Sequence, residues 1–360
     1  MIFMYALWFL FLICTPVYLF SSGGFQMAHV PLLILTLAII FRNRLFFFNN
    51  GPTKAFLGFT SYAVLINFLF FLNSGAEDTS FLIHCLYLLF NIMTLGVSFR
   101  MGGTPKGMNV TYWALLFIGV VQVGAFAVIG MNYGSVRYMA FFNNPNQLAA
   151  WGCMALVLVA CMKKVAVVSV LKFLMMAGVC ILLVLLTGSR AGTLTIACVL
   201  LIVFWRVPLW IKISIGLFAV LAFSWVIPFI EDTTFFSRTT ALSEENVGDD
   251  RLWSRVWEYP LYNFLGAGEG GLDRFDVPNE IHSTFLAALF CYGIPGLLLF
   301  FRFLKICTCR SLSNNFLLHV SPIFIIAMGH HMIRMTTFYV MLGTVAALLE
   351  VKFRKKEAFS

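Results

Sequence analysis

Long apolar runs recur along almost the whole chain, and they constrain the fold more than any other feature. A membrane helix needs about 20 apolar residues, and shorter spans are tolerated inside a bundle. Only 11% of the 360 residues are charged, which is too little to cover the surface of a soluble globule. The sequence therefore predicts an all-α, polytopic transmembrane bundle of about twelve spans. The predicted spans are residues 3–20, 27–41, 55–73, 80–98, 111–131, 147–161, 165–186, 190–205, 209–229, 282–304, 315–331 and 335–351.

These spans divide the chain into three parts. Residues 1–230 hold spans one to nine, and the first span is predicted to be retained, because it has neither a basic start nor a cleavage site. Residues 231–281 form one long outer loop. Residues 282–360 hold spans ten to twelve and a cytoplasmic tail.

The distribution of basic residues predicts the orientation. With both termini in the cytoplasm, every inner loop is basic, as the positive-inside rule requires of an inner-membrane protein. Seven basic residues then fall outside, and the other 17 of the 24 fall inside. The net charge of +9 thus indicates contact with anionic membrane lipid and not a nucleic-acid site. The outer seven are Arg137, Arg190, Arg238, Arg251, Arg255, Arg274 and Arg334.

All of the outer basic residues are arginine. A guanidinium group binds phosphate oxygens through two parallel hydrogen bonds and stays charged in a dry site. The bias therefore favours a phosphate or diphosphate ligand on the outer face. Chance, together with the depletion of outer lysine by the topology rule, explains the same count.

The outer loop is expected to be structured, since it is too rich in aromatic residues for a disordered segment. Its residues Leu252, Val256 and Tyr259 have helical spacing, which predicts a short amphipathic helix at the outer membrane boundary. Farther along, residues 266–271 read Gly-Ala-Gly-Glu-Gly-Gly. A dinucleotide fingerprint needs a preceding strand and a following helix, so this run is interpreted as a flexible turn.

Two short outer segments carry candidate ligand-binding groups. Arg190 lies in Thr187-Gly-Ser-Arg-Ala-Gly192 at a membrane boundary, where a charge is usually functional or paired. Arg137 precedes a run of amides that includes Asn143 and Asn146. A snorkelling arginine and ordinary N-cap chemistry are the alternatives for these segments.

His282 is the candidate acid–base group. It opens a span from the outer side and lies two residues after Glu280. A neutral imidazole near its ordinary pKa can remove a proton from an attacking hydroxyl. His330 and His331, close to Arg334, form a second outer candidate pair whose role stays open.

Over residues 130–300 these segments, in this order, resemble the bacterial O-antigen ligase and O-antigen polymerase superfamily. His282-Ser283, nine further residues and Gly293-Ile-Pro-Gly296 match its H[NSQ]-x9-G-x-x-[GTY] signature. The segment around Arg190 resembles its outer arginine motif. Arg251-Leu-Trp, followed by the glycine-rich run, resembles its long-loop pattern, and Asn143-Asn-Pro-Asn-Gln147 is similar to its upstream polar motif.

The resemblance implies a membrane glycosyltransferase of the C type that needs neither metal nor cofactor. Its donor is a glycan on undecaprenyl diphosphate at the periplasmic face. Its acceptor is the next lipid-linked repeat in a polymerase, for which a chain-length regulator is an expected partner, and lipid A–core in a ligase. A transporter of lipid-linked substrates is the alternative from another class, but the polar residues gather at one face and no internal repeat is present.

The resemblance also implies roles for single residues. Arg190 and Arg251, helped by Arg137, would stabilise the charge that grows on the leaving diphosphate. His282 would act as the general base, and Glu280 would orient it. The predicted substrate-binding set is Arg137, Asn143, Asn146, Glu280, Arg255 and Arg274.

Overall fold

The computed structural model describes residues 2–19, 26–129, 137–205, 251–309 and 316–357. Within these ranges the chain is helical and has no β-sheet. The predicted ninth span, 209–229, and the first part of the outer loop lie outside the described residues. The helices are α1 (Ile2–Cys14), α2 (His29–Asn49), α3 (Gly51–Asn73), α4 (Ser80–Gly102), α5 (Pro105–Ile129), α6 (Pro145–Lys164), α7 (Val170–Thr187), α8 (Arg190–Phe204), α11 (Arg255–Glu258), α12 (Tyr262–Leu265), the 3₁₀ turn η1 (Leu272–Arg274), α13 (Thr284–Thr308), α14 (Leu317–Val320), α15 (Ile323–Met328) and α16 (Thr336–Glu357).

Six of the described helices, namely α3 to α7 and α13, are long and apolar enough to cross a membrane. Shorter apolar stretches occur in α1, α2, α8 and α16. The fold is therefore that of an all-helical integral membrane protein, and the total of about twelve spans stays a prediction. The expected single span at 315–331 is instead two short helices, α14 and α15, separated by Ser321 and Pro322. Ser321 and Pro322 keep helical dihedral angles, so the break in the hydrogen-bond ladder follows from the backbone N–H that proline lacks.

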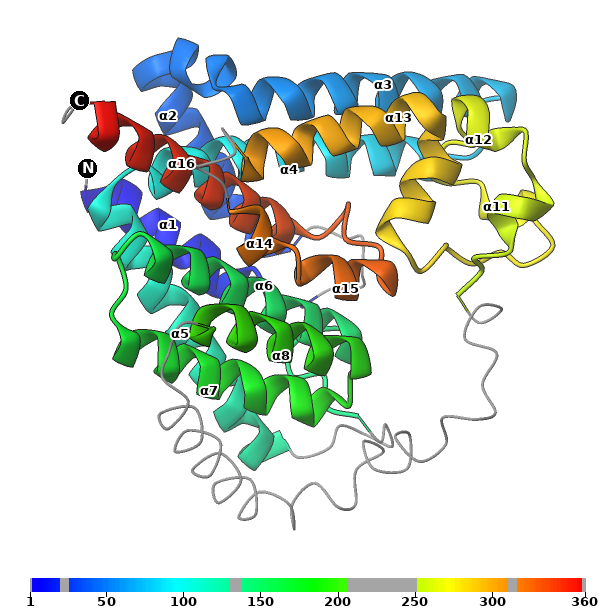
Figure 1. Cartoon of the computed structure of the whole chain (residues 1–360). Helices are drawn as coiled ribbons and strands as arrows, with labels where there is room; N and C mark the ends of the chain where they lie inside the picture. Colours follow the sequence, from blue (N-terminus) through cyan, green and yellow to red (C-terminus); the bar gives the residue numbers. More distant parts are fainter. Residues whose placement is uncertain (1, 20–25, 130–136, 206–250, 310–315, 358–360) are drawn as a thin grey trace.

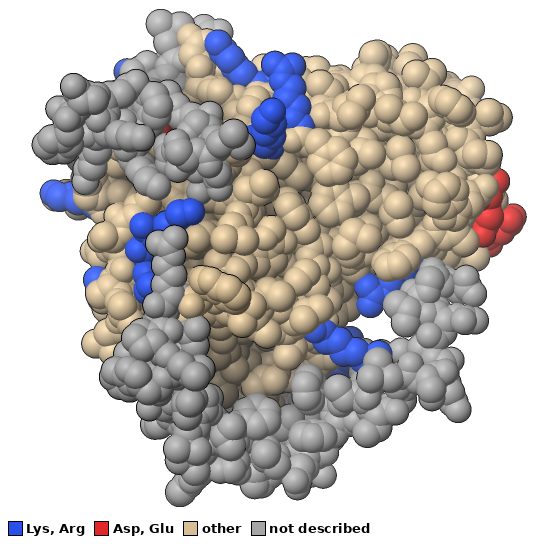
Figure 2. All heavy atoms as spheres, viewed as in Figure 1, with Lys and Arg blue, Asp and Glu red and all other residues tan. Residues whose placement is uncertain are grey.

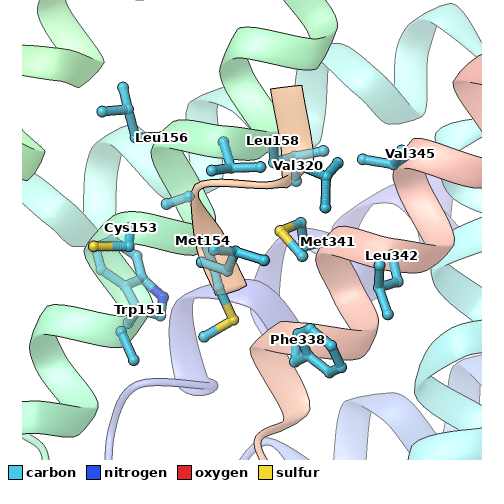
Figure 3. Packing of buried hydrophobic residues seen from close by; sticks show 14 of the residues in the cluster. Trp151, Cys153, Met154, Leu156, Leu158, Val320, Phe338, Met341, Leu342 and Val345 are labelled. Atoms are coloured by element: carbon cyan, nitrogen blue, oxygen red, sulfur yellow. The ribbon is translucent and has the colours of Figure 1, made fainter. Parts of the chain in front are cut away.

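Helix α6 lies at the centre of the bundle. Its residues Leu148 to Met162 are all buried, so no side of this stretch faces out. Helices α7, α8, α14, α15 and α16 all pack against it. Figure 3 shows side chains of α6 meeting Val320 of α14 and Phe338, Met341 and Val345 of α16 in one apolar cluster. A helix that is apolar all round belongs in a protein core or in a membrane, and the neighbours of α6 place it in the core of the bundle.

The outer helices present large apolar side chains to the surroundings. Leu65, Leu69 and Leu72 of α3 and Leu298 of α13 are each more than half exposed. Figure 2 shows a face that is mostly uncharged, with acidic groups at the end that carries α11 and α12 in Figure 1. Contiguous exposed apolar surface of this kind needs lipid to cover it.

The described part of the outer segment, residues 251–281, has a small core of its own. Val256, Phe275 and Ile281 pack with Phe290 of α13, which fixes the segment on one end of the bundle. The predicted amphipathic helix is much shorter than its apolar spacing suggests. Leu252 has φ of 54°, which is not helical, and the helix that does form, α11, is a single turn. The two chain ends lie at the opposite end of the bundle from α11 and α12 (Figure 1).

Candidate functional site

A cavity of about 750 Å³ lies where several helices begin. His29 at the start of α2, Arg190 at the start of α8 and Thr336 at the start of α16 all line it. Residues that the sequence singled out line the cavity together, namely Arg137, Asn146, Arg190, Arg251, Glu280, His282 and the second candidate group of His330, His331 and Arg334. Asn143, Arg255 and Arg274 do not line it.

One wall of the cavity is made of helix ends, and we call residues 137–147 and 187–191 the helix-end wall. Asn144 caps α6 by accepting a hydrogen bond from the Asn146 backbone N–H at 2.8 Å. The Arg137 guanidinium then joins the two segments. Its Nε donates to the Thr187 carbonyl and its Nη2 to Asn146 Oδ1, both at 2.7 Å.

The position of Arg190 follows from local capping. Helix α7 ends at Gly188, whose φ of 61° is a left-handed conformation that suits glycine. The Ser189 side chain then caps α8 by accepting a hydrogen bond from the Gly192 N–H at 3.2 Å. Arg190 is therefore the first residue of α8, at the edge of the cavity.

Arg251 and His282 lie together although 31 positions separate them in the sequence. The His282 backbone N–H donates to the Arg251 carbonyl at 3.1 Å, and Trp253 Nε1 donates to the His282 carbonyl at 3.4 Å. The Arg251 guanidinium packs on the backbone of Gly329, where an added Cβ would lie 2.1 Å from Nη1. Any larger residue at position 329 would displace this guanidinium.

The imidazoles beside Arg251 are held neutral. Partial burial, with His331 and Arg251 nearby, lowers the pKa of His282 below its ordinary 6.5. Burial, with Arg251, His282 and Arg137 nearby, lowers the pKa of His330 to about 3. At neutral pH, His282 can therefore accept a proton, and His330 is an uncharged group among guanidinium groups.

The structure gives Glu280 a different partner from the one expected. The sequence reading had Glu280 orient His282, but the Glu280 carboxylate accepts a hydrogen bond from Arg334 Nη2. Within the described ranges no ion pair joins a carboxylate to His282.

Sequence reasoning missed Glu269, which is only 5% exposed. Its Oε1 is 3.1 Å from Arg334 Nε, 3.5 Å from His331 Nδ1 and 3.8 Å from His84 Nδ1. Its Oε2 accepts a hydrogen bond from the Tyr292 hydroxyl. Burial by itself raises the pKa of this carboxyl, but His331, His84, Arg334 and the Tyr292 hydroxyl together lower it to about 2, so Glu269 is ionised at neutral pH.

A break in α13 creates the place for Glu269. Gly293 has φ of 65° inside the helix, and Pro295 has no N–H to donate to the Cys291 carbonyl. The backbone N–H groups of Ala267 and Gly268 instead donate to the Phe290 and Cys291 carbonyls, both at 2.8 Å. The segment 266–271 is thus packed against α13, and its interpretation as a flexible turn is wrong.

This contact requires glycine where the two segments cross. Gly266 has φ of 109°, and a Cβ there would lie 2.5 Å from the Cys291 carbonyl oxygen. A Cβ on Gly293 would lie 2.5 Å from the Leu265 carbonyl carbon. The one sequence signal for Glu269 is a single carboxylate inside a run of glycines, which lets the backbone approach closely and bury the charge.

Arg255 and Arg274, two of the predicted substrate-binding residues, have contacts within the outer segment. Arg255 is 3% exposed and donates to the carbonyls of Asn279, at 2.7 Å, and Val277. Arg274 donates to the Ala267 carbonyl and lies over the Phe70 ring, 4.6 Å from its centroid. Arg255 thus joins two parts of the outer segment, and Arg274 fixes that segment on α3.

Comparison with known protein families identifies a similar family. A family model described as O-Antigen ligase matches residues 173–301, and no curated protein matches the chain. The match confirms the resemblance to the O-antigen ligase and polymerase superfamily that the motifs indicated. It includes Arg190, Arg251 and His282 and ends before Arg334.

Proposed function

We propose that this protein, whose matched segment is similar to O-antigen ligases, is an inner-membrane glycosyltransferase. Its donor would be a glycan on undecaprenyl diphosphate, and it would polymerise O-antigen or surface-polysaccharide repeat units at the periplasmic face. One observation carries the proposal: arginines from separate parts of the chain and His282 line a single cavity at one end of an apolar bundle. The family match supports the same reaction class.

The charge of the cavity suits a diphosphate. Arg137, Arg190 and Arg251 line it and are the arginines assigned to the diphosphate, whereas Arg334, which also lines it, is paired with Glu280, the one carboxylate among the described lining residues. Guanidinium groups bind phosphate oxygens in pairs of hydrogen bonds. Because the leaving diphosphate gains negative charge as its bond to the sugar breaks, preorganised arginines in a poorly hydrated site lower the barrier.

His282 is the proposed general base. It would take the proton of the acceptor hydroxyl while the hydroxyl oxygen forms a bond to the anomeric carbon. The bond from that carbon to the diphosphate oxygen breaks, and its electron pair leaves with the diphosphate. A direct displacement of this kind inverts the anomeric centre. The motif resemblance implies a metal-independent reaction, and that feature stays a prediction.

The arrangement of the ends supports the proposed orientation. The cavity and the outer segment meet at Arg251 and His282, and both chain ends lie at the other end of the bundle. With cytoplasmic termini, which the positive-inside rule predicts, the cavity would lie on the periplasmic side.

A ligase is the second candidate, and the description of the matching family favours it. The same site would transfer the glycan to lipid A–core in place of the next lipid-linked repeat. A transporter is less well supported, since transporters place substrate sites near the middle of the membrane. Here the charged lining residues lie at helix ends and in the segments between helices.

The glycan ladder of a deletion strain distinguishes the two enzymes. Single repeats attached to lipid A–core would indicate a polymerase. Complete absence of attached repeats, with lipid-linked polymer accumulating, would indicate a ligase. Restoring the gene with His282→Ala should leave either defect uncorrected although the protein is inserted. A normal ladder in that strain would exclude His282 as the base.

A further inference from the structure

Four residues of the cavity region have no role in the mechanism above. Glu269, Glu280, His331 and Arg334 form a connected group, which we call the carboxylate cluster. Arg334 bridges the two carboxylates, with its Nε on Glu269 and its Nη2 on Glu280. The His331 ring lies against Glu269, with Nδ1 at 3.5 Å from Oε1. Arg334, His331 and Glu280 also line the cavity.

The carboxylate cluster differs in charge from the helix-end wall. It holds two carboxylates and one guanidinium, so its acidic groups outnumber its arginine. The helix-end wall contributes Arg137 and Arg190 to the cavity together with amides, and its described residues include no carboxylate. A diphosphate is therefore attracted to the helix-end wall and repelled by the cluster. The two sides of the cavity suit two different parts of the reaction.

His331 indicates what the cluster binds. Its side chain is 6% exposed, and neither ring nitrogen has a hydrogen-bond partner among the described residues. Buried polar groups without partners are rare in folded proteins, and a ligand group is one way to satisfy them. A sugar hydroxyl both donates and accepts hydrogen bonds, so it can bond to an imidazole nitrogen and a carboxylate oxygen at once.

We propose that the carboxylate cluster is the acceptor subsite of the cavity, where Glu280 and His331 bind hydroxyl groups of the acceptor sugar. Glu269 is its positioning residue, because it holds Arg334 and His331 in place from behind. This inference rests on the proposed glycosyl transfer. The reacting hydroxyl still gives its proton to His282, and neighbouring hydroxyls on the same sugar bind the cluster and orient it.

Two-substrate kinetics test the subsite with the full chain in proteoliposomes. The donor is the lipid-linked repeat extracted from the native strain. The acceptor probe is the same repeat oligosaccharide on an alkyl chain, which lacks a diphosphate and cannot serve as donor. Glu280→Gln should raise the KM for the acceptor by about tenfold or more and leave the KM for the donor unchanged, because it weakens a hydrogen bond to a charged group.

Matched variants sharpen the result. Arg137→Gln should raise the KM for the donor and leave that for the acceptor unchanged. Glu258→Gln, at an exposed carboxylate of α11 outside the cavity, should change neither. Glu269→Asp should restore part of the acceptor affinity that Glu269→Gln loses, which a purely steric role would not produce. A Glu280→Gln variant with a raised donor KM, or with both constants unchanged, overturns the proposal.

A binding measurement separates this inference from the proposed function. The alkyl-linked oligosaccharide should raise the melting temperature of the purified wild-type protein, and Glu280→Gln should abolish that shift. If the wild type binds the probe but transfers nothing to it, the glycosyltransferase assignment fails and the subsite stands. If the wild type transfers sugar and Glu280→Gln binds the probe equally well, the subsite fails and the glycosyltransferase assignment stands.

Discussion

The two sides of the cavity are built in different ways. On the helix-end wall, N-caps and one left-handed glycine place Arg190 and Asn146 at the starts of α8 and α6. On the other side, a break in α13 and a glycine-rich crossing place Glu269, which the protein buries. The N-caps keep the Arg190 side chain beside the cavity, whereas the glycine-rich crossing buries the Glu269 carboxylate among packed side chains. Substitutions in the helix-end wall should therefore affect mainly the rate of transfer. Substitutions around Glu269 should affect both the rate of transfer and the stability of the fold.

Removing the buried carboxylate should have the largest effect. Glu269→Ala leaves the Arg334 guanidinium without its inner partner, and breaking a buried pair costs about 3–5 kcal/mol. The free energy of unfolding in detergent measures this loss. Glu258→Gln on exposed α11 is the matched control and should stay within about 0.5 kcal/mol.

The same carboxylate gives stability a defined pH dependence. Its pKa is lowered from 4.5 to about 2 in the folded protein, so its contribution is present above pH 4.5 and is lost as the pH falls toward 2. The Glu269→Gln variant should lack this part of the acid sensitivity. Equal acid sensitivity in wild type and variant would show that the carboxylate is not ionised in the folded state.

Arg190 should show the opposite behaviour. Arg190→Ala should lower the rate of transfer by about 10²–10³-fold, the loss expected for one donor to a developing negative charge. The melting temperature should stay that of the wild type, because a cap and not the arginine starts α8. Arg302→Lys, at an exposed arginine outside the cavity, is the control for arginine substitution. Unfolding of Arg190→Ala would remove the distinction between the two sides.

Gly266→Ala tests the crossing itself. The positive φ with an extended ψ of 157°, a region that only glycine adopts readily, and the contact with Cys291 should together cost about 2–3 kcal/mol of folding free energy. Gly75→Ala is a close control, because Gly75 has φ of 71° and nothing within 4 Å of an added Cβ. It should cost only the backbone part, about 1–2 kcal/mol. Equal losses at both positions would mean that the segment is not packed against α13.

The pH profile of transfer should show the smallest effect. A general base acts in its neutral form, so the rate should rise with pH through the lowered pKa of His282 and level off near neutrality. Arg251→Gln removes a nearby positive charge, which raises that pKa and moves the acid limb to higher pH. At any one pH, the rate of the variant relative to its own plateau should differ from the same ratio in the wild type by less than about tenfold, because charge interactions at exposed sites are weak. A shift to lower pH would contradict this assignment of the base.

The sequence predicted the helix-end side of the site because its signals are local. The Gly188 end of α7 and the residues before α6 and α8 are adjacent to the groups they position, so Arg137, Asn146 and Arg190 could be identified without the fold. His282 and Arg251 were found from motif spacing. The superfamily resemblance is confirmed, whereas the roles of the site residues stay predictions.

Other features depend on contacts between distant residues and could not be predicted in this way. Glu269 is paired with Arg334, 65 positions away, and its burial depends on carbonyl groups released by Gly293 and Pro295. The sequence predicted that Arg255 and Arg274 bind a ligand, yet both donate hydrogen bonds to backbone carbonyls in their own segment. The run of apolar residues also predicted one span at 315–331, because a run of this kind contains no information about the helix break at Pro322.

The enclosed position of α6 has a consequence for biosynthesis. Most of the helices that cover it, from α7 to α16, are translated after it. A nascent chain therefore inserts α6 before its neighbours exist, and its apolar faces meet lipid or translocon until the last helix arrives. The residues just before α16 also complete the cavity. Premature termination anywhere before α16 should therefore produce an inserted but inactive and protease-sensitive chain, with no partly active intermediate.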